Sequence, residues 1–397
     1  MQGAHGAPAR KRRGAQGPPQ ATEPGCGAEP HVSWKARPLR SAFEMLARMP
    51  DPHPTPIATS VPLPQEAIAT PRVVAIGGGT GLPTVLEGIR MVWGGSTGHD
   101  QHSPGWLTAV VTVMDDGGSS GRLRDALGVL PPGDIRNCLA ALVREPSTLS
   151  QILHDRLPGE RGGLGHPIGN LLLAALSGTE GDLLGAISRL GTQMGITGRV
   201  LPATLESVHL TAAFEDGCDI RGETAIAARR GRIRRLALER PVRPVPEAIE
   251  ALVNADLIVV GPGSLYTSLL PNLLVDGVAA TISAVNATRV YVANLMTEPG
   301  ETDGYSLGDH LRALREHTGF DLFDYVLVNR APLPGPALAH YAADGARVIS
   351  SGDGIAASGR GRVVTADLAT VTSSGQIRHD PGALGFALTA LCGSRRP

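Results

Sequence analysis

The organised part of the chain opens with the stretch Val73-Val74-Ala75-Ile76-Gly77-Gly78-Gly79-Thr80-Gly81-Leu82-Pro83. A short apolar run is broken by a glycine-rich turn, and a helical stretch begins at Leu82-Pro83. Proline suits the first turn of a helix because no amide hydrogen is needed there. The pattern predicts a buried strand that leads through a tight loop into a helix, which is the unit of a parallel α/β sheet.

The same succession of apolar run, turn and helical stretch returns several times, which predicts an α/β fold with a mostly parallel sheet and helices on both faces. The further apolar runs are Leu107–Val113, Asp256–Val260, Arg289–Ala293, Asp324–Val328 and Val363-Val364. Around residues 205–240, alternating polar and apolar residues predict a small antiparallel excursion. Helices are predicted near Ser306–His317 and Pro381–Leu391.

Residues 1–71 differ in composition from the rest of the chain. They hold 13 of the 32 prolines, a basic run at residues 10–13 and a net charge of +3. Such a segment buries too little apolar surface to offset its ordering entropy. We therefore predict a disordered Pro-rich basic tail over 1–71 and a single domain over 72–397, whose part 331–397 is Gly- and Ala-rich and ambiguous in pattern.

Composition excludes several classes of protein. The chain has 397 residues, 42% of them hydrophobic, and a formal net charge of −1, which argues against bulk electrostatic binding to nucleic acid or membrane. No stretch reaches the roughly 20 apolar residues that a spanning helix needs. The four cysteines are scattered without paired spacing, so we expect neither a zinc site nor disulfides and predict a cytoplasmic location.

Arginine replaces lysine almost completely. Of 36 basic residues, 34 are arginine, and the two lysines, Lys11 and Lys35, lie in the predicted tail. From residue 36 onward this excludes a Schiff-base lysine, a lysine general base and a Walker-type phosphate lysine. An anionic ligand of this chain must be held by arginine, backbone amides or a metal.

Two glycine-rich loops follow predicted strands, the first at Gly77–Gly81 and the third at Gly261–Ser268. Glycines let backbone amides approach an anion, and the helix that follows favours negative charge at its start. The first loop fits a phosphate cradle, the alternative being a tight turn without a ligand. In the third loop, Tyr266 fits either stacking on a base or core packing. The phosphate-binding residues that we predict are Gly78, Gly79, Thr80, Gly81, Gly261, Gly263, Ser264, Asn294 and Arg136.

The second loop, Asp115–Gly121, brings two adjacent carboxylates to the end of a predicted strand. Asp115 and Asp116 fit three roles: Mg²⁺ binding, with Asp115 as the ligand, hydrogen bonding to a ribose or sugar hydroxyl, or pairing with Arg122 or Arg124. The same loop matches G-x-S-x-G around Ser119, the pattern of a hydrolase nucleophile elbow. Against this interpretation, Asp115 and Asp116 would place negative charge beside a developing oxyanion, and no sequence feature identifies a partner histidine.

Three further segments complete the candidate site. The fourth loop, Asn294–Tyr305, is polar and acidic, and fits a cover over a sugar, a source of a metal ligand or an ordinary surface loop. Asp134 is predicted to be the N-cap of a helix that places Arg136 and Asn137 in its first turn. His166 fits either a buried hydrogen-bonding role or contact with a ligand.

Taken together, these segments resemble the gluconeogenesis factor family of bacteria, within the larger group that includes 2-phospho-L-lactate transferase. The resemblance covers roughly residues 72–330 and implies a Rossmann-like core that binds nucleotides, including UDP-activated amino sugars. It also implies a cytoplasmic regulator needed for normal cell shape during growth on gluconeogenic carbon sources. The motifs that carry it are Gly77–Pro83, Asp115–Arg124, Pro131–Leu139, Gly165–Leu176, Gly261–Leu270 and Met296–Asp303.

Three functions follow as hypotheses. The first is a regulatory protein without established turnover that binds a nucleotide-sugar such as UDP-N-acetylglucosamine and needs no cofactor. The second is a Mg²⁺-dependent transferase resembling 2-phospho-L-lactate transferase, and the third is a serine hydrolase built on Ser119. A nucleotide or nucleotide-sugar is the expected partner, nucleic acid is not, and a homodimer is the default oligomer.

Overall fold

The computed structural model describes residues 71–94, 106–158, 164–352 and 361–392. All of them belong to the second of two units into which the chain divides, residues 65–397. Apart from Pro71, the predicted tail lies outside the described residues, and the single-domain boundary at residue 72 stays a prediction.

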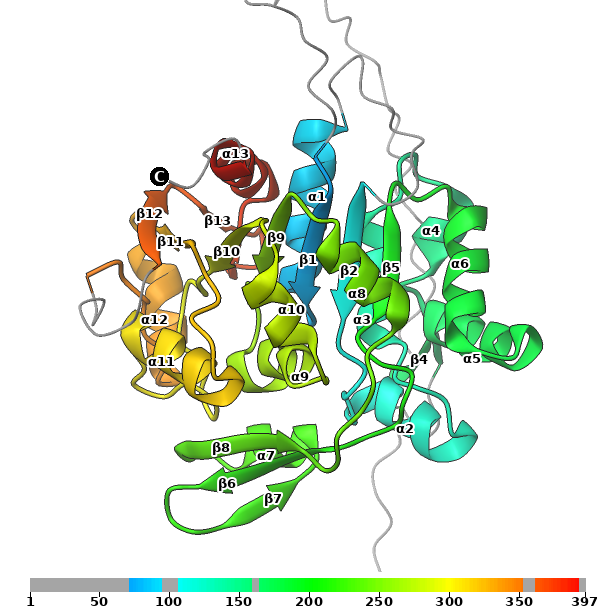
Figure 1. Ribbon diagram of the computed structural model, residues 1–397, viewed down its shortest axis with the longest axis horizontal. Helices are drawn as coiled ribbons and strands as arrows, with labels where there is room; N and C mark the ends of the chain where they lie inside the picture. Colours follow the sequence, from blue (N-terminus) through cyan, green and yellow to red (C-terminus); the bar gives the residue numbers. More distant parts are fainter. Residues whose placement is uncertain (1–70, 95–105, 159–163, 353–360, 393–397) are drawn as a thin grey trace, which may run out of the picture. The chain divides into compact units, whose positions relative to one another are not determined.

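A seven-stranded sheet forms the centre of this unit, and all its pairings are parallel (Figure 1). The strand order is β12-β11-β10-β9-β1-β2-β5. This confirms the predicted α/β class with a mostly parallel sheet. The strands are β1 Val73–Gly77, β2 Leu107–Val111, β5 Arg199–Pro202, β9 Leu257–Val260, β10 Thr288–Val292, β11 Tyr325–Asn329 and β12 Arg362–Ala366.

Helices cover both faces of the sheet because successive residues of its strands point to opposite sides. Val73 and Ala75 of β1 belong to one hydrophobic cluster, whereas Val74 and Ile76 belong to the other. The first cluster includes residues of α1 Gly81–Trp93, α3 Gly133–Ala141, α6 Leu183–Met194 and α13 Pro381–Cys392. The second includes residues of α8 Pro246–Val253, α9 Leu270–Leu273, α10 Val278–Ala284 and α11 Leu307–Thr318.

A separate antiparallel sheet confirms the predicted excursion around residues 205–240 (Figure 1). It has the order β7-β6-β8, and a short helix follows its β7 strand. Phe214 and Leu236 pack its inner face into the second cluster. Its elements are β6 Leu210–Phe214, β7 Asp219–Arg221, α7 Glu223–Ala228 and β8 Ile233–Leu238.

The remaining elements lie between β2 and β5 or after β11, and the sequence pattern did not predict most of them. The edge strand β5 is short and ends in proline, which suits only the edge of a sheet. The ambiguous C-terminal part contains a helix and a small hairpin before α13. These elements are α2 Gly118–Leu127, α4 Thr148–Ile152, β3 Arg156–Pro158, β4 Leu164–Pro167, α5 Ile168–Glu180, α12 Gly335–Ala343, β13 Ala369–Val371 and β14 Ile377–His379.

Among the described helices, none alone combines the length and the apolar character that a membrane span requires. One bent pair, Leu265–Leu273 with Val278–Ala284, has both when its two segments are taken together, by length and composition only. Residues of both segments are buried in the second hydrophobic cluster.

Two glycines bring α1 and α13 into backbone contact. A Cβ atom at Gly385 would lie 2.2 Å from the carbonyl oxygen of Gly88, which is backbone and has little freedom to move away. We expect Gly385→Ala to lower the free energy of unfolding by about 1–3 kcal/mol in urea denaturation, because the two helices must separate. Gly382→Ala is the matched control, since its Cβ would meet only the Asp380 carboxylate at 3.4 Å. Equal stability of both variants would contradict this contact.

Candidate functional site

The carboxyl ends of β1 and β9 lie side by side at the centre of the sheet. From β1 the chain proceeds through β2 to β5 on one side, and then returns to β9, β10 and β11 on the other. Ligands of open parallel sheets bind where the strand order reverses in this way. The first and third loops, which follow β1 and β9, therefore flank the expected crevice.

Close backbone contact joins these two loops. Gly81 begins α1, and a Cβ atom there would lie 2.1 Å from the carbonyl oxygen of Pro262. Only glycine fits at this position unless the third loop moves. The N-cap residue Thr80 makes no side-chain hydrogen bond to the helix, so the first-turn amides of α1 are not capped by it. A helix start of this kind favours an anion.

Asn294 connects the third loop to the fourth. Its Oδ1 accepts a hydrogen bond from the Gly263 amide at 2.9 Å, and its Nδ2 donates to the Gly263 carbonyl at 2.9 Å. Nδ2 also donates to Glu298 Oε1 at 3.1 Å, while Ser264 hydrogen-bonds the same carboxyl group. Asn294, at the end of β10, thus connects the backbone of the third loop to the fourth loop.

A pocket of about 280 Å³ opens between these loops and the C-terminal part of the chain. Four of the predicted phosphate-binding residues line it: Thr80, Gly81, Gly263 and Asn294. Gly78, Gly79, Gly261, Ser264 and Arg136 are not among its lining residues, although the first four lie in the same loops.

The opposite wall of the pocket comes from residues that the sequence analysis did not identify, namely Tyr341, Arg378 and His379. Arg378 donates to the Ile377 carbonyl and to Gln376 Oε1, both neutral oxygens. Tyr341 joins α12 to β14 through hydrogen bonds with the Ile377 backbone. Burial lowers the pKa of His379 to about 4, so the imidazole is neutral at pH 7. Their segment is Gly- and Ala-rich with no loop motif, so no sequence signal marked them.

On the other side of the first loop, Asp134 accepts a hydrogen bond from the Gly79 amide at 2.8 Å. The prediction that Asp134 is the N-cap of α3 is wrong, because Pro132 occupies that position and Asp134 lies in the first turn. Its carboxylate reaches across to the first loop instead. Burial, and to a smaller extent the charge of Asp115, raise the pKa of Asp134 to about 6.

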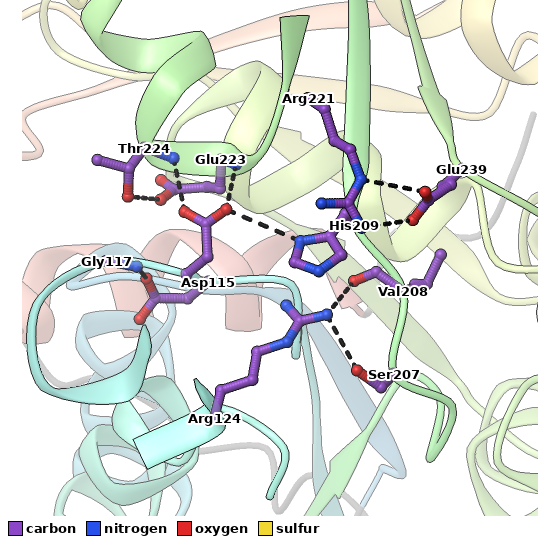
Figure 2. A network of polar contacts seen from close by, with 11 residues as sticks. Asp115, Gly117, Arg124, Ser207, Val208, His209, Arg221, Glu223, Thr224 and Glu239 are labelled. Atoms are coloured by element: carbon purple, nitrogen blue, oxygen red, sulfur yellow. Dashed lines mark hydrogen bonds and ion pairs between the residues drawn. The ribbon is translucent and has the colours of Figure 1, made fainter. Parts of the chain in front are cut away.

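Figure 2 shows how the second loop meets the antiparallel sheet. Asp115 accepts the Gly117 amide at 2.8 Å, whereas the carboxylate of Asp116 accepts the amides of Glu223 and Thr224 at the start of α7. Burial and then the charges of Asp115 and Asp116 raise the pKa of Glu223 to about 7. Burial also raises the pKa of Asp115. Carboxyl groups in this state release their protons more readily when a cation binds.

Arg124 does not provide that cation by direct contact. Its Nη2 donates to Ser207 Oγ at 3.0 Å and to the Val208 carbonyl at 2.9 Å (Figure 2). Within the described residues it forms no ion pair with either aspartate of the second loop, so Arg124 is not the arginine that would pair with them. The buried guanidinium instead fastens the segment before β6 to α2.

A metal ion would need ligands from outside the protein at this place. In the part of the chain that the structure describes, no group of three or more His, Cys, Asp or Glu side chains is arranged to hold a metal. Mg²⁺ in nucleotide sites is commonly bound by one or two carboxylates together with substrate phosphates and water. Asp115 and Asp134 fit this limited role. Asp134 hydrogen-bonds the first loop at Gly79, and Asp115 follows β2, the strand that pairs with β1.

Two interpretations of the third and fourth loops are decided by burial. Tyr266 is 1% exposed, and its ring packs edge-to-face on Tyr305, so it is a core residue and does not stack on a base. The fourth loop is not an ordinary surface loop, since Thr297, Glu301 and Thr302 are all buried. Glu301 accepts hydrogen bonds from the hydroxyl of Thr267 and the amide of Tyr266.

The chain is similar in sequence to a protein family and to several known proteins. The family described as 2-phospho-L-lactate transferase CofD matches residues 73–369. A gluconeogenesis factor from Halalkalibacterium halodurans is 42% identical over 70% of this chain and 83% of the relative. A gluconeogenesis factor from Listeria monocytogenes is 41% identical over 81% of this chain and 95% of the relative.

A solved structure agrees with these relatives. The crystal structure of a protein from Bacillus halodurans superposes with a TM-score of 0.74 and 38% sequence identity, covering 80% of this chain and 99% of that one. Fold, motifs and relatives agree that this chain belongs to the 2-phospho-L-lactate transferase CofD family and is similar to its members named gluconeogenesis factor.

Proposed function

We propose that this chain binds a nucleotide-sugar, with UDP-N-acetylglucosamine as the first ligand to test. The observation that carries the proposal is the pocket of about 280 Å³ at the reversal point of the sheet. Its walls include the start of α1, which Thr80 does not cap, the glycine backbone of the third loop and the guanidinium of Arg378, beside the side chains of Glu298 and Asp344. The first three are the groups that a lysine-free domain can offer to a diphosphate.

The proposed role is regulatory. The names of the relatives support a function in growth on gluconeogenic carbon sources. We propose that the protein acts in the cytoplasm, is needed there for normal cell shape, and reports the level of a nucleotide-sugar without converting it. A deletion strain that keeps normal shape on such carbon sources would contradict this role.

Arg378 provides the sharpest test of the binding site. Within the described residues, its hydrogen bonds go only to neutral oxygens, so a bound phosphate would give Arg378 an anionic partner. A charge-assisted hydrogen bond contributes about 1.5–3 kcal/mol, so we expect Arg378→Ala to weaken UDP-N-acetylglucosamine binding about 10- to 100-fold in titration calorimetry.

Arg362→Ala is the control for this prediction. Arg362 is exposed at the start of β12, whereas the pocket lies beyond the carboxyl ends of the strands. We expect this variant to bind like the unchanged protein. Absence of binding heat over a wide concentration range would contradict the proposal itself. Equal affinity of Arg378→Ala would place the ligand elsewhere.

The second candidate is a Mg²⁺-dependent group transfer resembling that of 2-phospho-L-lactate transferase. The carboxyl groups of Asp115, Asp134 and Glu223, whose pKa values are raised mainly by burial, support it. Asp115 and Asp134 would hold Mg²⁺ together with phosphate oxygens, and the ion would neutralise charge on a leaving nucleotide. Mg²⁺-dependent release of GMP from an activated phospholactate, lost in Asp134→Asn, would favour this function.

A further inference from the structure

A continuous chain of hydrogen bonds links four side chains from four elements near the second loop. Arg136 Nη1 in α3 donates to Asn170 Oδ1 in α5 at 2.8 Å. Asn170 Nδ2 donates to Ser119 Oγ in α2 at 3.0 Å, and Ser119 Oγ lies 2.8 Å from Nδ1 of His166 in β4. Asn170 and Ser119 are 1% and 9% exposed, so the centre of the chain is largely screened from water.

Arg136 determines which atoms donate in this series of hydrogen bonds. Arginine has only donors, so the Asn170 atom that faces Arg136 must be the oxygen. The amide nitrogen of Asn170 therefore faces Ser119 and donates to its hydroxyl oxygen. The Ser119 hydrogen is then free to point at His166, whose Nδ1 accepts it when the imidazole carries its proton on Nε2.

In that tautomer, every donor of these hydrogen bonds points from Arg136 toward His166. Such aligned hydrogen bonds polarise one another. The cation of Arg136 and the amide of Asn170 therefore stabilise negative charge on Ser119 Oγ, while His166 is placed to take its proton. An oriented base on one side and a donor to the oxygen on the other are the requirements of an activated serine nucleophile.

The position of Ser119 agrees with this chemistry. Ser119 is the central residue of the pattern G-x-S-x-G, which here runs from Gly117, the N-cap of α2, to Gly121 and so places Ser119 in the first turn of the helix that follows β2. In hydrolases the same strand-to-helix context presents a nucleophilic serine. The histidine that the sequence did not identify comes from β4, 47 residues further along the chain.

The neighbouring aspartates bear on the class of substrate. The carboxylate of Asp116 is held by two backbone amides at the start of α7, and Asp115 by the amide of Gly117. Their negative charge disfavours a phosphate ester, which carries its own charge, whereas the carbonyl of a carboxylic ester is neutral.

We propose that Ser119 is a nucleophile and His166 its general base, supported by Asn170 and Arg136, and that the pair hydrolyses carboxylic esters. Ser119 Oγ forms a bond to the ester carbonyl carbon while its proton passes to His166 Nδ1. The carbon–oxygen bond to the alcohol breaks, and the alcohol leaves with that proton. Water then attacks the acyl-serine, His166 takes a proton from it and returns one to Ser119, and a carboxylic acid is released.

The test treats the full chain with a fluorophosphonate probe and maps the labelled peptide by mass spectrometry, with p-nitrophenyl butyrate hydrolysis measured in parallel. We expect labelling at Ser119 and none in Ser119→Ala. His166→Asn keeps an acceptor for the Ser119 hydroxyl but is no base, so labelling and hydrolysis should slow about 100-fold or more. A merely structural hydrogen bond would survive this replacement with no change in rate.

Ser177→Ala is the matched control, because Ser177 lies on α5 with its hydroxyl bonded to the Leu173 carbonyl. It should be labelled at Ser119 as fast as the unchanged protein. The proposal fails if the unchanged protein shows no label on Ser119, or if His166→Asn reacts at the same rate. Neither outcome depends on nucleotide-sugar binding, which uses the pocket on the other side of the first loop.

Discussion

Replacing Arg289 with methionine is expected to lower the free energy of unfolding by about 3 kcal/mol or more, as for other buried ion pairs that lose one partner. Arg289 lies in β10 and its side chain is 10% exposed. Its Nε and Nη2 bind both carboxylate oxygens of Asp324 at 3.0 and 2.8 Å, and Nη1 donates to carbonyls at the end of α10. Methionine fills the space but leaves these acceptors without the guanidinium.

Urea denaturation measures the effect, and Arg330→Met is the control. Arg330 pairs with Asp367 through two hydrogen bonds as well, but both side chains are more than 60% exposed, and such pairs contribute roughly 0–1 kcal/mol. Joining Arg289→Met with Asp324→Leu should recover much of the lost stability, because no charge then stays buried. A loss below about 1 kcal/mol for Arg289→Met alone would show that the pair contributes no more than a surface contact.

The architecture was predictable because its signals are local. Each central strand is a short apolar run, and burial on both faces requires such runs in a parallel sheet. The capping residue Ser306 and the glycine after Thr318 bound α11 in the same local way. Strand β5 was missed because four residues ending in proline give too short a pattern, although its pairing with β2 closes the edge of the sheet.

The candidate site was predictable only where its chemistry lies in a loop motif. Glycine-rich turns at strand ends identify the first and third loops. The wall formed by Tyr341, Arg378 and His379 depends on how α12 and the β13–β14 hairpin fold back, which no local pattern encodes. The hydrogen-bond partner of Ser119 was not predicted either, because His166 lies in a different element and is brought close only by the tertiary fold. The sequence around Asp134 predicts a helix cap, because the hydrogen bond that it accepts from Gly79 depends on the tertiary fold and not on neighbouring residues.

Two carboxyl groups in the fourth loop, Glu301, which is buried, and Glu298, which is half-buried, make the stability of this region depend on pH. Burial, and then the charge of Glu298, raise the pKa of Glu301 to about 7. Burial raises the pKa of Glu298 as well. Glu301 holds the third loop through Thr267 and Tyr266, while Glu298 holds Asn294, so both carboxyl groups bind the loops that line the pocket.

The sign of the pH effect follows from the raised pKa of Glu301. The native state keeps its proton to about pH 7, whereas the unfolded chain releases it near pH 4.5. Between these values the native state binds more protons, so stability falls as the pH rises. We expect the free energy of unfolding to drop by about 2 kcal/mol more between pH 5 and pH 8 in the unchanged protein than in Glu301→Gln, at about 1.4 kcal/mol per pKa unit.

Urea denaturation at pH 5 and pH 8 tests this expectation, and Glu206→Gln tests the sign. A hydrogen bond from Arg240 holds the pKa of Glu206 at about 2, so its contribution is lost only in acid and the slope between pH 5 and pH 8 should stay close to that of the unchanged protein. Because glutamine preserves an acceptor for Thr267, Glu301→Gln should fold normally and differ mainly at high pH. An unaltered slope in Glu301→Gln would mean that this carboxyl group is ionised throughout the range, and that the contacts of the fourth loop hold a charge which burial alone would not permit.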